Sequence, residues 1–144
     1  MNKFLRLLSL ALLVLILTSC APKESISNPD LYGVWQVKEI KDVEEKQREV
    51  ESTLRVDDLI YISKNDYIIG NDVIHEAKTK YRRVLLEDYL FFNYKIELND
   101  IDAEYADVYS IYEGGSFRYD LIICNEKMLI KLGKYLYTLE KTDK

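Results

Sequence analysis

The stretch FRYDLIICNEKMLIKLGKYLYTLEK, residues 117–141, decides the fold class of this chain. It consists of alternating apolar and polar residues, interrupted by short polar turns. The residues that share one face of its first segment are Phe117, Tyr119, Leu121 and Ile123. A period of two is typical of a strand with one buried face. The last two segments meet at Gly133-Lys134, and glycine at the first position of a two-residue loop favours a type II′ hairpin. The stretch therefore predicts three antiparallel strands, at 117–124, 128–132 and 135–141, with a turn at 125–127.

The same pattern continues from this stretch toward the N-terminus. Further strands are predicted at residues 31–41, 56–62, 67–70, 73–75, 78–86, 90–98 and 104–112. Residues 90–98 give the clearest of them, because every second residue from Leu90 to Leu98 is apolar. Asn71-Asp72 predicts a hairpin turn. Residues 42–52 are charged and predict either a long loop or a short surface helix.

These segments predict an all-β protein without a core helix. About eight sequential antiparallel strands form an up-and-down barrel or a sandwich. We favour the barrel, because closure removes the exposed strand edges that invite aggregation. The 12 tyrosines agree with a strand-rich fold, since aromatic residues are enriched in strands.

The charge of the chain argues against one class of partner. With 20 basic and 25 acidic residues the net charge is −5, and without the two N-terminal cations Lys3 and Arg6 it is near −7. An acidic domain is a poor binder of polyanions, so no nucleic acid partner is expected. The same charge disfavours electrostatic attachment to an anionic bilayer.

The first 19 residues have the features of an export signal. Lys3 and Arg6 precede an apolar run at residues 7–17, and the small polar residues Thr18 and Ser19 follow it. The run is shorter than the ~20 apolar residues that a transmembrane helix needs. Residues 1–19 are therefore predicted to be a cleaved signal peptide, which takes no part in the fold.

The end of this segment resembles a known processing motif. Leu17-Thr18-Ser19-Cys20 resembles the lipobox of bacterial lipoproteins. The resemblance implies that Cys20 carries diacylglycerol and acyl chains such as palmitate, and that it becomes the first mature residue. It places the protein in the cell envelope, on the outer face of the cytoplasmic membrane in a monoderm. In a diderm the outer membrane is expected, since Ala21 follows the cysteine. Residues 20–30 then form a lipidated tether, and residues 31–141 the folded domain.

The start of this domain resembles the lipocalin (calycin) superfamily. The residues that carry the resemblance are Gly33 and Trp35, a Gly-x-Trp signature on the opening strand. It implies a small barrel that the tryptophan closes at one end. In larger lipocalins an arginine near the last strand packs over this tryptophan, whereas the last strands here offer only lysines. Residues 32–38, 59–67 and 134–141 together resemble lipocalin-like lipoproteins of low-GC bacteria, which have no agreed activity.

No motif predicts catalysis, a cofactor or a metal site. The single histidine, His75, and the second cysteine, Cys124, cannot supply the three or four converging ligands of a zinc site. The acidic turn at 100–104 does not fit a calcium-binding loop, because glycine and the final glutamate are missing at their positions. The basic run at 78–83 is interpreted as a solvated sheet edge.

The sequence thus predicts a membrane-anchored binding domain that is not an enzyme. Its covalent lipid at Cys20 provides the contact with the membrane. An eight-stranded barrel is just wide enough to hold one small ligand or to be filled by its own side chains. Two alternatives follow: a small apolar ligand in the barrel, or an envelope protein bound by a filled barrel acting as an inhibitor or immunity-type module.

Overall fold

The computed structural model describes residues 30–44 and 53–142. That part of the chain forms nine strands and one helix, which follow in sequence order. They are β1 (Gly33–Asp42), β2 (Leu59–Ile62), β3 (Tyr67–Ile69), β4 (Asp72–Ile74), β5 (Lys78–Leu85), α2 (Leu86–Tyr94), β6 (Tyr105–Glu113), β7 (Ser116–Cys124), β8 (Lys127–Leu132) and β9 (Tyr135–Lys141). The predicted signal peptide, Cys20, most of the tether and most of the charged segment at 42–52 lie outside the described residues.

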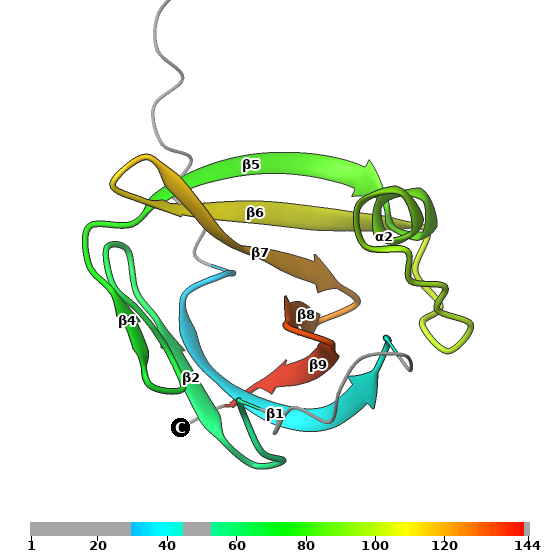
Figure 1. The fold of residues 1–144 in the computed structure, drawn as a ribbon, viewed down its shortest axis with the longest axis horizontal. Helices are drawn as coiled ribbons and strands as arrows, with labels where there is room; N and C mark the ends of the chain where they lie inside the picture. Colours follow the sequence, from blue (N-terminus) through cyan, green and yellow to red (C-terminus); the bar gives the residue numbers. More distant parts are fainter. Residues whose placement is uncertain (1–29, 45–52, 143–144) are drawn as a thin grey trace, which may run out of the picture.

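The strands form one antiparallel sheet in the order β4-β3-β2-β1-β9-β8-β7-β6-β5. The prediction of an all-β fold is confirmed. The sheet curls into a half-barrel in which the first strand pairs with the last (Figure 1). The nine strands agree with the expected number of about eight, but among the described residues the sheet is open where a closed barrel was expected, because β4 and β5 form its two unpaired edges.

The connection between β4 and β5 changes the direction of the chain at the two edges of the open sheet. Glu76 adopts a left-handed backbone conformation, with φ at 53°, and the N–H of Ala77 donates to the carbonyl oxygen of Asn65 at 3.0 Å. The chain therefore leaves the direction of β4 before β5 begins. Figure 1 shows β5 running away from β4 across the top of the half-barrel.

The turns of the sheet follow local sequence signals. Gly133 has φ at 57° and Lys134 has an ordinary φ, as the predicted type II′ turn between β8 and β9 requires. Asn125 and Glu126 are both left-handed, at 47° and 64°, which suits a type I′ hairpin between β7 and β8. The β3–β4 turn lies at Gly70-Asn71, one residue before the predicted position.

The predicted strand at 90–98 is wrong, because α2 covers most of that range. Leu86, Tyr89 and Leu90 bury one helical face, and Glu87 and Asp88 in the first turn favour the positive end of the helix dipole. The helix ends at Lys95, which has φ at 58°. The N–H of Lys95 donates to the carbonyl of Phe91, which is the bond of the αL C-terminal motif, and the N–H of Ile96 donates to the carbonyl of Leu90.

Two hydrophobic clusters lie on opposite faces of the sheet. The inner cluster fills the concave side and includes Trp35, Val37, Ile60, Tyr137 and Leu139, all buried. The helix-side cluster lies beneath α2 and includes Leu86, Leu90, Val108, Ile122, Leu129 and Leu136. Neighbouring residues of one strand, such as Leu136 and Tyr137, belong to different clusters because side chains alternate across a strand.

Candidate functional site

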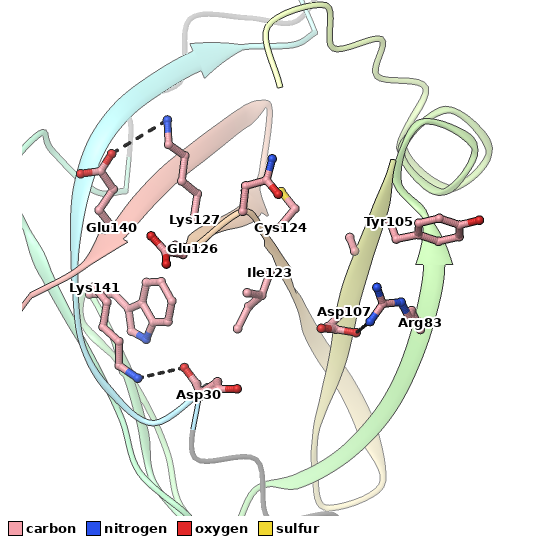
Figure 2. Close-up of a pocket in the computed structure, with 13 residues that line it drawn as sticks. Asp30, Arg83, Tyr105, Asp107, Ile123, Cys124, Glu126, Lys127, Glu140 and Lys141 are labelled. Carbon is pink, nitrogen blue, oxygen red and sulfur yellow. Dashed lines mark hydrogen bonds and ion pairs between the residues drawn. The ribbon is translucent and has the colours of Figure 1, made fainter. Parts of the chain in front are cut away.

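A cavity lies between β1–β9 on one side and β5–β6 on the other, beside the turn that joins β7 to β8 (Figure 2). This mouth pocket has a volume of about 900 Å³. It is lined by 13 residues, seven of which carry a charge at neutral pH. Its acidic side chains are Asp30, Asp107, Glu126 and Glu140, and its basic ones are Arg83, Lys127 and Lys141. The wall is therefore polar, with both signs of charge.

Opposite charges face one another around the mouth pocket. Figure 2 shows Lys127 beside Glu140 on one wall and Arg83 beside Asp107 on the opposite wall. The nitrogen-to-oxygen distance is 3.9 Å in each of these ion pairs. Exposed pairs of this kind add about 0–1 kcal/mol to stability. They leave both sets of charges accessible to a partner that offers complementary groups.

Gly33 and Trp35 meet Lys141 at the base of this pocket. The indole N–H of Trp35 donates to the carbonyl oxygen of Leu31 at 3.0 Å, and the ring is 2% exposed. The Lys141 ammonium lies 5.6 Å from the centre of the Trp35 ring and donates to the carbonyl oxygen of Asp30 at 3.0 Å. This geometry suits a cation–π interaction. A cation of the last strand thus packs over the tryptophan, with lysine in place of arginine.

Backbone conformation and packing explain why residue 33 is glycine. Its φ of 138° is one that residues with a side chain rarely adopt. A Cβ at this position would also lie 2.8 Å from Cε of Lys141. The glycine therefore lets the lysine side chain cross the first strand and reach the indole.

A second polar cluster lies on the helix side, around Asp120 of β7. Its carboxylate is 5% exposed and accepts hydrogen bonds from Tyr89 at 2.5 Å, from Ser110 at 2.5 Å and from Tyr94. Arg82 donates to the Tyr89 hydroxyl at 2.5 Å. Two of the donors belong to α2, so this carboxylate attaches the helix to the sheet. The sequence did not single it out, because Asp120 occupies an ordinary polar position of an alternating strand.

The remaining candidate residues do not converge. His75 is exposed and bonds to Asp66 at 2.8 Å, and Asp100 pairs with Lys41 at 3.3 Å. Cys124 is buried, and burial raises the pKa of its thiol to about 11, which disfavours the nucleophilic thiolate. Within residues 30–44 and 53–142, no group of three or more His, Cys, Asp or Glu side chains could hold a metal ion.

Comparisons with known proteins identified no similar protein. Searches of protein-family models, curated proteins and solved structures each found no match to this chain. In the part of the chain that the structure describes, no helix is both long and apolar enough to cross a membrane. The functional conclusion therefore depends on the residues of the chain itself.

Proposed function

We propose that this chain is an envelope lipoprotein, anchored through Cys20, whose lipocalin-like domain binds a partner protein and catalyses no reaction. The observation that supports binding of a protein is the contrast between the filled interior and the charged mouth pocket. Apolar side chains of the inner cluster occupy the concave side. Seven charged residues line the pocket that remains open.

The charged wall favours a polar partner over an apolar one. A small apolar ligand in the mouth pocket would displace water from Glu126, Lys127 and their neighbours without replacing its hydrogen bonds, which is costly. A protein surface can offer charges of both signs, and such complementarity improves specificity and the rate of association. The mouth pocket is therefore the proposed contact site, with the lipid holding it close to the membrane.

The anchor is tested by metabolic labelling with an alkyne analogue of palmitate. We expect Cys20→Ser to lose the label and Cys124→Ala to keep it, because the buried Cys124 is not the proposed lipid site. Continued labelling of the Cys20 variant would refute the anchor.

Protein binding is tested by photocrosslinking in intact cells. A photoreactive side chain at Glu126, in the mouth pocket, should crosslink to an envelope protein, and the same group at the exposed Lys38 should not. Equal crosslinking from both positions, or from neither, would contradict a partner at the mouth pocket.

A second candidate, a small apolar ligand, is favoured by one observation: Trp35 borders the mouth pocket. Since Trp35 is the single tryptophan, its fluorescence reports on this site. Saturable quenching by fatty acids, with no crosslinked protein, would support this candidate and replace the first.

A further inference from the structure

Within residues 30–44 and 53–142, strand β5 forms a long free edge of the curled sheet. It pairs with β6 over all eight residues and is the terminal strand of the sheet on that side. Seven of its eight residues are exposed, and only Val84 is half-buried. The opposite edge, β4, has three residues, so β5 offers the longer template for pairing.

The backbone of β5 presents hydrogen-bonding groups along this edge. The N–H of Leu86 donates to the carbonyl oxygen of Glu104 at 3.0 Å, in register with the β5–β6 ladder. Opposing residues of antiparallel strands alternate between bonded and non-bonded pairs. The N–H and C=O groups of Tyr81 and Arg83 and the N–H of Leu85 therefore point away from β6, whereas the C=O of Leu85, the N-cap residue of α2, begins the hydrogen bonding of the helix.

The start of β5 is less accessible than the rest. The Thr79 hydroxyl lies 3.1 Å from the hydroxyl of Tyr67 on β3, and Ala77 bonds to Asn65. These contacts bring the β2–β3 region against the first residues of the edge. The open length is therefore residues 80–85, enough for a partner segment of about six residues at ~3.3 Å each.

The side chains of β5 differ between its two faces. Lys80 and Arg82 lie on the helix side, where Lys80 is 4.7 Å from the Tyr112 ring centre and Arg82 contacts Tyr89. On the inner side, Tyr81 and Leu85 are 40% and 45% exposed. The strand also carries Lys78 and Arg83 and has no acidic residue, although the whole chain has a net charge of −5.

We propose that β5 is the docking edge for an extended acidic segment of a partner protein, which adds to the sheet as a further strand. Its acidic side chains would face Lys80 and Arg82, and the apolar ones between them would cover Tyr81 and Leu85. Main-chain bonds supply affinity in this mode of recognition and alternate side chains supply specificity. A second copy of β5 is disfavoured, because the three cations of its open length would face the same three cations of the other copy. This inference depends on the proposed function, since it adds a second contact of the same partner beside the mouth pocket, which Arg83 of β5 also lines.

The test uses the full chain in detergent micelles and three fluorescent peptides of nine residues. The first alternates glutamate with valine, the second alternates lysine with valine, and the third is the acidic peptide with alternate backbone nitrogens methylated. We expect the acidic peptide to bind about tenfold or more tightly than either other peptide, because charge and main-chain hydrogen bonds both contribute. Amide exchange of Tyr81, Arg83 and Leu85 should slow when the acidic peptide is bound.

Two charge-reversal variants locate the site. Lys80→Glu should weaken binding of the acidic peptide about tenfold, whereas Lys38→Glu, the same change on the exposed surface of β1, should change it less than about twofold. Equal binding of the methylated peptide, protection of amides elsewhere, or dimers joined through β5 would overturn the proposal. Crosslinking from Glu126 together with any of these outcomes would leave the proposed function in place and refute only the edge.

Discussion

The inner cluster and the helix-side cluster lie on opposite faces of the same strands, yet different interactions stabilise them. The inner cluster consists of apolar and tyrosine side chains around Trp35, and packing holds it together. The helix-side cluster lies beside the polar cluster around the buried carboxylate of Asp120, which needs the hydroxyl groups of Tyr89, Tyr94 and Ser110. The first cluster is therefore sensitive to lost volume, and the second to lost hydrogen bonds.

The largest expected effect tests the inner cluster. Trp35→Ala removes the largest fully buried side chain and its bond to Leu31, and should lower the free energy of unfolding by about 3–5 kcal/mol. Chemical denaturation followed by far-UV circular dichroism measures the loss. Tyr61→Ala, which truncates an exposed aromatic on β2, is the control and should cost less than about 1 kcal/mol. Equal losses of unfolding free energy in the two variants would show that packing around Trp35 does not dominate the stability of the inner cluster.

An intermediate effect tests the helix-side cluster. Asp120→Asn keeps the shape but replaces a charged acceptor of three hydrogen bonds with a neutral amide, and should cost about 2–3 kcal/mol. Amide hydrogen exchange should rise in α2 more than in β1, since Tyr89 and Tyr94 tie the helix to Asp120. Uniform acceleration across both elements would show that the carboxylate does not act on the helix in particular.

The smallest effect is a pH dependence of the hydrogen bonds that join α2 to Asp120. Burial, together with the hydrogen bond to Asp120, raises the pKa of Tyr89 to about 12 and also raises the pKa of Tyr94. Unfolded tyrosine loses its proton near pH 10, so above that pH the folded state holds more protons than the unfolded state. The stabilising contribution of Tyr89 is complete below about pH 10 and should be lost as the pH rises through about 12, and that of Tyr94 should also begin to decline above about pH 10.

This decline is measured as the denaturation midpoint between pH 8 and pH 12. At pH 8 the Tyr89→Phe variant should have a lower denaturation midpoint than the wild type. Between pH 8 and pH 12 its midpoint should fall by less than that of the wild type. Tyr61→Phe, which changes an exposed tyrosine, should follow the wild-type curve. A Tyr89→Phe curve parallel to the wild type would refute the role of this hydroxyl.

Much of the fold could be predicted from the sequence where the apolar residues of a segment fit one period only. In residues 117–141, apolar and polar residues alternate within each segment between turns. The strands of this stretch and the turn at Gly133 lie as predicted. The prediction of a strand at residues 90–98 failed because Leu90, Phe91 and Phe92 are all apolar. The segment therefore fits a period of two, but it also fits the helical face that Leu86, Tyr89 and Leu90 form. Phe92, assigned to the buried face of that strand, is 68% exposed.

The candidate site was less predictable, because it depends on distant pairings. Gly33 and Trp35 were visible as a motif, but the position of Lys141 over the indole follows from the pairing of β1 with β9. Asp120 is one of many acids in the sequence, and only α2 packing over β7 shows that it is buried. The absence of pairing between β4 and β5, among the described residues, is a further long-range feature that no residue-type pattern marks.

The pairing of β1 with β9 also has a kinetic consequence. Trp35 lies opposite Lys141, so the first strand of the domain cannot complete its ladder until the final residues of the chain are available. Contacts between such distant positions raise the contact order, which slows folding. Until then β1 presents an unpaired edge on that side, and transiently exposed edges of this kind promote aggregation. The first strand of the domain therefore remains prone to aggregation until the last strand, β9, is available to pair with it.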